Sequence, residues 1–275
     1  MDLNVTRYEV SDGVALITLD RPERLNAWTS RMEVEYRSCL GAADADPEVR
    51  VIVVTGSGRG FCAGADMAAL DGYAAGEEYD LTATEAVAQP ADSRPDWSGS
   101  FSYALGLAKP VIAAVNGATA GVGFVLMCFT DIRFAASGAK LTTSFARLGL
   151  PAEHGLSWVL PRLVGAGRAA DLLYSSRVVL AEEARSMGLI NEVYPADELL
   201  EATMTYARTM AAECAPSSLH AMKRQLWGDL LGSLEESWHG AVDSMTTMIT
   251  GGDFKEGLAA FQAKRPPEFP GVAHR

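Results

Sequence analysis

The sequence contains few of the residues from which metal and redox sites are built. It has four cysteines and four histidines in 275 residues. The cysteines form no C-x-x-C pair and the histidines form no H-x-x-x-H pair, so we expect no metal site and no disulfide. Free thiols are typical of a reducing compartment, and we therefore expect a cytoplasmic protein.

Motifs for bound nucleotides and for serine nucleophiles are also missing. The loop at 56–60 is rich in glycine, but no G-K-[ST] follows it, as a phosphate-binding loop requires. The serines at 57, 144 and 157 lack the G-x-S-x-G context of a serine hydrolase. We therefore expect no separate cofactor and no serine triad.

Positive charge is scarce. The chain has 23 basic and 35 acidic residues, for a formal net charge of −12. This balance argues against nucleic acid or an anionic membrane as a partner. The run from Val111 to Thr130 carries no charge and has the length of a membrane span, but Asn116-Gly117 and the glycines at 121 and 123 divide it into a strand, a turn and a helix. The N-terminus also lacks the features of a signal peptide.

Hydrophobic patterning indicates an α/β core followed by helices. Apolar residues make up 48% of the chain, which is enough for a sizeable core. Strands are predicted at 4–10, 14–19, 50–55, 111–115, 131–135 and 190–194, and helices at 29–43, 100–108, 121–129, 166–174, 181–187, 197–213, 216–230, 234–250 and 253–263.

Strands separated by helices imply right-handed βαβ units, while the polar residues 72–99 are interpreted as an excursion from the core. We therefore divide the chain into an α/β core at 1–195 and a helical C-terminal region at 196–275.

Two turns built from small residues are the most informative part of the chain. The segment from Phe61 to Asp66 follows one apolar strand, and Gly121-Val122-Gly123 comes shortly after another. Small residues let a backbone approach a ligand closely, and a helix that begins there aims free N–H groups at it. Two such turns could form an oxyanion hole, although each alone could be an ordinary strand-to-helix turn.

Taken together, these motifs resemble those of the enoyl-CoA hydratase/isomerase (crotonase) superfamily. The family pattern F-x-A-G-x-D is matched by Phe61, Ala63, Gly64 and Asp66, and K-P-x-I-A-A-V-N-G by residues 109–117. The segments L-P-R-L-V-G at 160–165, R-P with N-A at 21–27, and K-R-P-P at 264–267 are also similar to the family. The resemblance covers roughly residues 3–270.

The resemblance implies a fold and an assembly. The fold would be the crotonase-like (ClpP/crotonase) spiral of ββα units, with a helical C-terminal region that makes trimer contacts and helps to cover the active site. The expected assembly is a homotrimer or a hexamer built as a dimer of trimers. The expected substrate is an acyl-CoA thioester, as in fatty acid metabolism and β-oxidation, so that CoA enters as part of the substrate.

The resemblance also assigns binding residues. The N–H groups of Ala65 and Val122 would hold the thioester carbonyl as an oxyanion hole. Ala63 would offer its carbonyl to the adenine, and Asp66 and Met67 would line the ligand. Arg24 could contribute to a local basic patch for CoA. By the family pattern, Phe261 and Lys264 of one subunit would approach the CoA of a neighbour.

The acid/base residues depart from the hydratase pattern. The two positions at which hydratases carry glutamates fall on Val125 and Phe145. Apolar side chains can neither position nor deprotonate water. Glu153 remains, in a segment that resembles the one where the family's Δ3,Δ2-enoyl-CoA isomerases place a single catalytic acid. We therefore expect double-bond isomerisation with Glu153 as the acid/base.

Alternatives remain open at this point. The chain could be an enoyl-CoA hydratase, converting 2-enoyl-CoA to 3-hydroxyacyl-CoA, with Glu153 as its only carboxylate. It could also be a non-catalytic acyl-CoA-binding protein. From the residues alone, Glu153 could be a solvated loop residue or a helix cap, and the adjacent His154 is the competing base.

Overall fold

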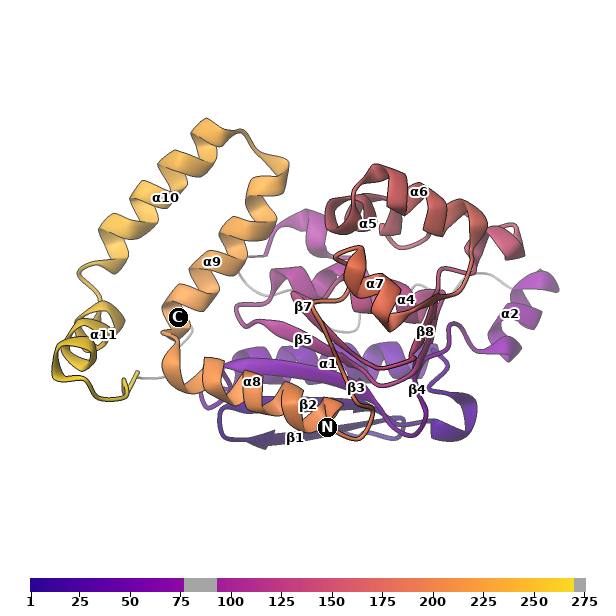
Figure 1. Ribbon diagram of the computed structural model, residues 1–275, viewed down its shortest axis with the longest axis horizontal. Helices are drawn as coiled ribbons and strands as arrows, with labels where there is room; N and C mark the ends of the chain where they lie inside the picture. The colour runs from indigo at the N-terminus through magenta and orange to yellow at the C-terminus, as the bar shows by residue number, and fades with distance from the viewer. Residues whose placement is uncertain (77–92, 270–275) are drawn as a thin grey trace.

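The computed structural model of the chain describes residues 1–76 and 93–269, arranged around two β-sheets (Figure 1). The main sheet has six strands in the order β1-β2-β3-β5-β7-β10. Its strands are β1 (Thr6–Ser11), β2 (Val14–Leu19), β3 (Val51–Gly56), β5 (Val111–Val115), β7 (Ile132–Ala136) and β10 (Glu192–Tyr194). β1 and β2 form the predicted antiparallel hairpin, and the remaining neighbours are parallel.

A second, smaller sheet lies beside the main one. It consists of β4 (Gly60–Cys62), β6 (Ala118–Ala120), β8 (Lys140–Thr142) and β9 (Val179–Leu180), in that order. Each pair β3-β4, β5-β6 and β7-β8 takes the chain from the main sheet to the small one, and a helix then follows. This repeated strand, strand, helix path is the spiral of ββα units that the resemblance implied.

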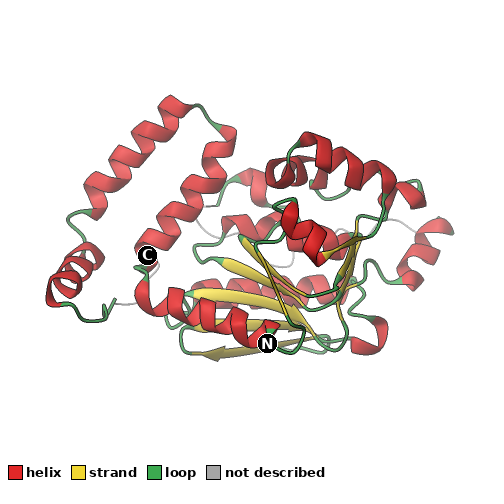
Figure 2. Cartoon of the chain, in the orientation of Figure 1, coloured by secondary structure: helices red, strands yellow, loops and turns green. Residues whose placement is uncertain are grey.

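Helices cover both sheets (Figure 2). They are α1 (Ser30–Ala45), α2 (Met67–Ala74), α4 (Val122–Cys128), α5 (Leu156–Val164), α6 (Ala166–Ser175), α7 (Ala181–Ser186), α8 (Leu199–Glu213), α9 (Pro216–Gly228), α10 (Leu234–Met248) and α11 (Gly252–Ala263). Short 3₁₀ helices are η1 (Pro22–Arg24), η2 (Pro95–Trp97), η3 (Ser102–Gly106), η4 (Phe145–Leu148) and η5 (Asp229–Leu231).

The core lies on the main sheet. All residues of β3 and β5 are buried, as expected for parallel strands that are covered on both faces. α8 packs along β2, β3, β5, β7 and β10, and α1 packs on β1 and β2. Thr29 caps α1, because its hydroxyl accepts the N–H of Met32 at 3.2 Å.

The C-terminal arm, which we define as α10 and α11, projects from this body (Figure 1). No residue of α10 is buried, and α11 buries only Ala260. α9 connects the arm to the body through two buried side chains, Lys223 and Trp227. α8 is the first helix after residue 195, and it packs on the main sheet. The part of the chain that projects from the body therefore begins after α8.

Some predicted elements differ from the observed ones. The helix expected at 100–108 is only the 3₁₀ helix η3, which ends at Gly106, and the carbonyls of Ser98 and Gly99 before it accept hydrogen bonds from Arg37. The expected excursion at 72–99 begins later, since α2 continues to Ala74, and residues 77–92 lie outside the described part. The uncharged run from Val111 divides into β5, β6 and α4, and no described helix is long and apolar enough to cross a membrane.

Candidate active site

The structure brings the two small-residue turns into contact. β4 and β6 are parallel neighbours, and each is followed at once by one of the turns. A Cβ atom on Gly121 would lie 3.7 Å from the Cα of Gly64, and one on Gly123 would lie 2.1 Å from the carbonyl oxygen of Cys62. Gly64 has a φ of +108°, which side chains rarely allow. Glycine at these positions therefore permits the close approach of the two backbones.

Each turn contains a backbone N–H group that has no acceptor in the described part of the chain. The chain around Ala65 pairs with Trp28, whose N–H donates to Gly64 at 2.8 Å and whose carbonyl accepts from Asp66 at 2.9 Å. This pairing leaves the N–H of Ala65 with no acceptor among residues 1–76 and 93–269. Val122 is the first residue of α4, and its N–H is likewise unused there. Two such groups on touching turns can hold one oxyanion.

Asp66 is engaged in the fold. One carboxylate oxygen accepts the N–H of Ala68 at 3.1 Å, and the other pairs with Arg21 at 2.9 Å. Arg21 also donates to the carbonyl of Ala27 at 2.7 Å. Its hydrogen bond is the main cause that holds the pKa of Asp66 below the usual range. In the sequence Arg21 stands out only as a motif residue, whereas in the structure its ion pair with Asp66 holds the Ala65 turn in place.

Other family-like residues also act on the backbone. Asn26 donates to the carbonyl of Gly60 at 2.8 Å, and Asn116 donates to that of Gly58 at 2.9 Å. Both therefore fix the loop that enters β4. Lys109 is buried and donates to the carbonyl of Ala43 at 2.6 Å, at the end of α1, and burial lowers its pKa to about 8. No local sequence pattern shows whether Asn26, Asn116 and Lys109 hold the backbone or bind a ligand.

The predicted binding residues around the first turn lie at its rim. Ala63 is half-buried, and its N–H donates to the carbonyl of Leu25 at 3.0 Å. Met67 begins α2 with 67% of its surface exposed. Arg24 ends η1, is exposed, and contributes to the lowered pKa of Asp66. The thiol of Cys62 is buried beneath the turn, which raises its pKa to about 12.

The two positions at which the resemblance places hydratase glutamates carry buried apolar side chains. Val125 is fully buried in α4, and Phe145 is 4% exposed at the start of η4. Glu153 lies in the loop before α5 and is half-buried. Its carboxylate forms no hydrogen bond or ion pair with any residue that the structure describes, and burial raises its pKa. This carboxylate is therefore free to take up and return a proton.

His154 has a different environment from its neighbour. It adopts a left-handed backbone with a φ of +51°, and its ring meets the Phe101 ring edge-on at 5.1 Å. Burial lowers its pKa, which favours the neutral imidazole. The pKa values of the adjacent Glu153 and His154 are thus shifted in opposite directions. The cause is the same for both, because burial excludes water from the charged form of each side chain.

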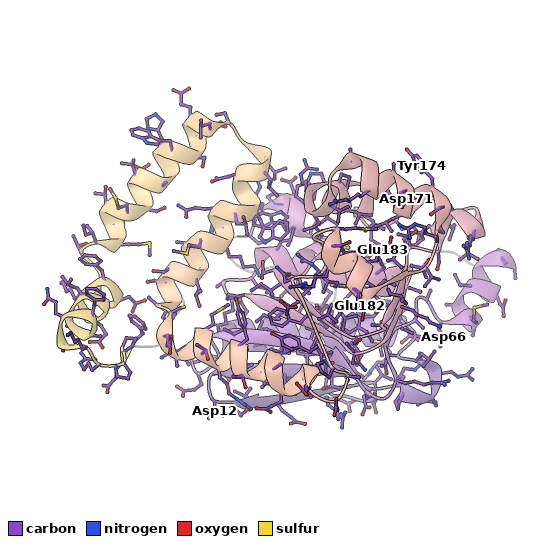
Figure 3. All side chains as sticks on the ribbon, viewed as in Figure 1. Asp12, Asp66, Asp171, Tyr174, Glu182 and Glu183 are labelled. Atoms are coloured by element: carbon purple, nitrogen blue, oxygen red, sulfur yellow. The ribbon has the colours of Figure 1, made fainter. Side chains whose placement is uncertain are left out.

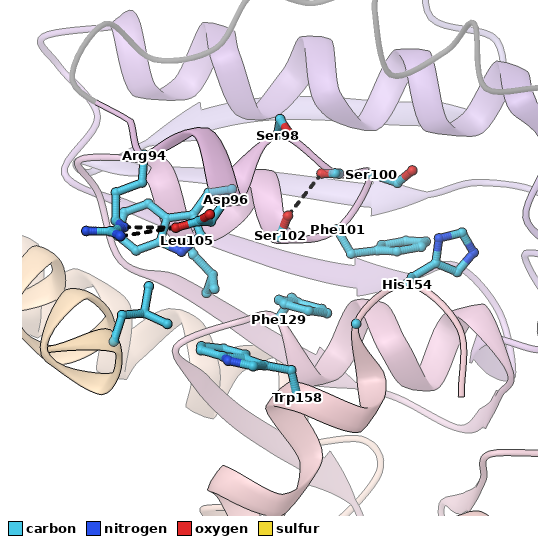
Figure 4. Close-up of a pocket in the computed structure, with 14 residues that line it drawn as sticks. Arg94, Asp96, Ser98, Ser100, Phe101, Ser102, Leu105, Phe129, His154 and Trp158 are labelled. Carbon is cyan, nitrogen blue, oxygen red and sulfur yellow. Dashed lines mark hydrogen bonds and ion pairs between the residues drawn. The ribbon is translucent and has the colours of Figure 1, made fainter. Parts of the chain in front are cut away.

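A cavity of about 850 Å³ lies beside these residues (Figure 4). Its lining includes Phe101, Phe129, His154, Gly155 and Trp158, but not Glu153 itself. The Phe101 ring packs on Trp28 at 5.2 Å, and Trp28 pairs with the Ala65 turn. Phe101 therefore connects the cavity wall to the segment that pairs with the Ala65 turn. No local sequence pattern indicated this cavity.

Phe261 and Lys264 do not reach the turns within one chain. Both lie on or at the end of α11, where Phe261 is 83% exposed and Lys264 is exposed with a φ of +52°. Asp66, labelled in Figure 3, lies at the opposite end of the molecule from α11. The neighbouring Arg265 pairs with Glu256 at 2.6 Å and lowers the pKa of that carboxyl to about 2.

Comparisons with known proteins agree over nearly the whole chain. The family model for enoyl-CoA hydratase/isomerase matches residues 9–272. A probable enoyl-CoA hydratase of Rhodobacter capsulatus is 36% identical over 271 residues, which cover 98% of this chain and 100% of that protein. The 1,2-epoxyphenylacetyl-CoA isomerase of Escherichia coli is 34% identical and covers 95% of this chain and 97% of its own length.

Solved structures are similarly close. The crystal structure of a probable enoyl-CoA hydratase/isomerase from Mycobacterium abscessus superposes with a TM-score of 0.86 at 33% identity. It covers 97% of this chain and 99% of its own.

Proposed function

The chain belongs to the enoyl-CoA hydratase/isomerase family, with its crotonase-like fold, and is an enzyme of that family; from this premise we propose that it moves a double bond in an enoyl-CoA thioester. When a proton leaves C2, which lies between the thioester carbonyl and the double bond of a 3-enoyl-CoA, negative charge grows on the thioester oxygen. The N–H groups of Ala65 and Val122 would stabilise that enolate. Removing one such donor typically raises the barrier by about 3 kcal/mol.

The observation that carries the proposal is the carboxylate of Glu153. It is half-buried and unpaired among the described residues, while apolar side chains occupy the two hydratase positions. In a 3-enoyl-CoA, it would remove a proton from C2 and return it to C4, so that the double bond moves to C2 and C3. No water is consumed, and one base is sufficient. A raised pKa brings a carboxylate nearer to the range in which it can both accept and return a proton.

The second candidate function is hydration of a 2-enoyl-CoA. It is supported by the relatives whose names read probable enoyl-CoA hydratase. Glu153 would then have to activate water and also protonate the α-carbon without a second carboxylate. The products formed from 2-enoyl-CoA and 3-enoyl-CoA thioesters, measured side by side, separate the two reactions.

The replacement Glu153→Gln tests the proposed base. It keeps the shape of the side chain but removes its basicity, so turnover of a 3-enoyl-CoA should fall at least about a hundredfold. Exchange of solvent deuterium into the α-carbon should fall in parallel, and thioester binding should change little. The matched control is Glu198→Gln, an exposed glutamate that directly precedes α8. Near-normal turnover and exchange in Glu153→Gln would transfer the role to His154.

The pH dependence provides an independent readout. The base must be ionised, so activity should be lost as the pH falls through the raised pKa of Glu153, above the usual value of about 4.3. Burial opposes ionisation, so the ionised carboxylate of Glu153 lowers the unfolding free energy at pH values above its pKa. Glu153→Gln should therefore not lower the unfolding free energy at neutral pH. If the activity of the unaltered protein falls only near the ordinary pKa of a carboxylate, this assignment is contradicted.

We propose further that the working assembly is a trimer, alone or as a dimer of trimers. The support is the C-terminal arm, which exposes large apolar side chains to solvent: Leu234, Trp238, Met245, Ile249 and Phe261. In such an assembly, Phe261 and Lys264 would approach the CoA of a neighbouring subunit, while Ala63, Arg24 and Met67 would contact it from the chain's own first turn. The unpaired thiols support a reducing compartment such as the cytoplasm.

A further inference from the structure

Residues that line the 850 Å³ cavity contact or directly follow the segments that carry the candidate catalytic groups. Phe101 connects it to Trp28 and the Ala65 turn, Phe129 directly follows α4, and His154 directly follows Glu153. α4 has seven residues and so is about 10 Å long. The cavity wall at Phe129 therefore lies about that far from the N–H of Val122. A group in the cavity would belong to the distal part of an acyl chain whose thioester lies at the turns.

Aromatic side chains line part of the cavity, together with polar ones such as Arg94 and Asp96 (Figure 4). Phe101 and Phe129 are 2% and 3% exposed, so they are packed in the core. Trp158 is covered by the guanidinium of Arg162, at 4.1 Å from its ring centroid. Any side chain at Gly155 would meet Phe129, since a Cβ there would lie 3.3 Å from the ring. Fixed aromatic walls favour an aromatic guest, because rings pack edge-to-face or offset against one another.

One polar group of the lining has no partner. Ser100 is 92% buried, since only 8% of its surface is exposed, and its hydroxyl bonds to no residue in 1–76 or 93–269. The backbone before it is fixed, because Arg37 donates to the carbonyls of Ser98 and Gly99 at 3.3 Å each. The hydroxyl oxygen itself is accessible, so it can form a hydrogen bond with a ligand oxygen in the cavity.

We propose that the cavity binds the distal part of the substrate's acyl group, and that this part is an aromatic ring with an oxygen substituent that Ser100 hydrogen-bonds. The inference rests on the proposed acyl-CoA activity and names the class of acyl group. The volume lies within the 300–1,000 Å³ that ligand pockets commonly span, and it is larger than a short alkyl chain requires.

The test is a set of dissociation constants for saturated CoA thioesters, which cannot undergo the double-bond shift. Butyryl-CoA is compared with thioesters that carry a cyclohexyl, a phenyl or a 4-hydroxyphenyl ring on one common alkyl linker. We expect the phenyl thioester to bind at least about tenfold more tightly than butyryl-CoA, and more tightly than the cyclohexyl one. The hydroxyl should add about fivefold, the contribution of one neutral hydrogen bond.

The variant Ser100→Ala should abolish the gain from the hydroxyl and leave phenyl binding unchanged. Its control is Ser102→Ala, in the same lining, whose hydroxyl already lies 3.5 Å from the carbonyl of Gly99. Equal affinities for butyryl, cyclohexyl and phenyl thioesters, in a protein that still turns over short enoyl-CoA, would overturn this inference alone. Failure to bind or turn over any thioester would overturn the proposed function as well. The ligand series on the unaltered protein does not depend on the folding of a variant.

Discussion

The turns of the small sheet and the C-terminal arm differ in what surrounds them. At the turns, backbone meets backbone, and a single added carbon on Gly123 would lie 2.1 Å from a carbonyl oxygen. In the arm, Gly240 has no atom within 4 Å of the same added carbon, and Leu234 is 86% exposed. The turns obtain their geometry from within the chain. The arm carries apolar surface that the chain itself does not bury.

This difference separates two kinds of site in one protein. The groups proposed for chemistry, at Ala65 and Val122, belong to the part that is complete in a single chain. The groups proposed to reach CoA from a neighbour, Phe261 and Lys264, belong to the part that is not. Mutations in the first part should therefore act on folding and turnover, and those in the second on assembly and binding.

The largest effect is expected from replacing glycine by alanine, once in the turns and once in the C-terminal arm. Gly123→Ala should lower the free energy of unfolding by about 4 kcal/mol or more and remove activity, because the clash is with backbone and no rotamer relieves it. Gly240→Ala should leave stability unchanged or raise it by up to about 1 kcal/mol, since alanine is the better helix former. Urea denaturation and turnover of both variants measure this difference. Similar losses of stability and activity in the two variants would contradict it.

The joint between the regions should be nearly as sensitive. Lys223 is buried and pairs with Asp131 at 2.8 Å, and Trp227 donates to the same carboxylate at 2.7 Å. Lys223→Met leaves a buried carboxylate without its cation, so we expect a loss of about 3 kcal/mol in unfolding free energy. Lys255→Met, on an exposed side chain of α11, is the control and should change it by less than about 0.5 kcal/mol. Equal effects would mean that the pair does not anchor α9.

A smaller effect on stability, but a large one on assembly, is expected in the arm. Trp238 is 61% exposed, and Trp238→Glu should dissociate the oligomer while the circular dichroism spectrum of the chain is retained. Sedimentation velocity measures the change. Tyr174→Glu is the control, because Tyr174 is 80% exposed on α6, outside the arm (Figure 3). An unaltered protein that sediments as a monomer would contradict the role given to the arm.

The smallest effect is expected at the end of the arm. Lys264→Ala should weaken CoA-thioester binding by a few-fold at low salt and hardly at all at about 0.5 M salt, since exposed charges are screened. Titration calorimetry at two salt concentrations measures it, with the exposed Lys140→Ala as control. A dissociation constant that is unchanged at both concentrations would exclude Lys264 from the CoA site.

Much of the fold could be predicted because its signals are local. The apolar runs at β3, β5 and β7 predicted buried strands, and Thr29 marked the start of α1. The strands of the small sheet have only two or three residues and show no periodic pattern. These strands form by pairing with segments from other parts of the same chain. No short stretch of sequence therefore predicts them.

The candidate site was predictable to a lesser degree. The two glycine-containing turns and the apolar residues at Val125 and Phe145 could be read from the chain. The clamp of Arg21 on Asp66 joins positions 45 residues apart, and the bond from Lys223 to Asp131 joins positions 92 apart. Such partners depend on the packing of whole elements. Spacing along the chain carries no signal for them.

By itself, the sequence determined the family, the alternation of strands and helices, and the apolar residues at Val125 and Phe145, because these depend on residue type and short-range order. Only the tertiary structure decided that the turns touch, that the carboxylate of Glu153 is half-buried, and that an aromatic cavity with Ser100 lies beside it. The physical reason is that burial and close contact are properties of packed surfaces. Residues distant in the chain meet there, and each one's environment is set by the others.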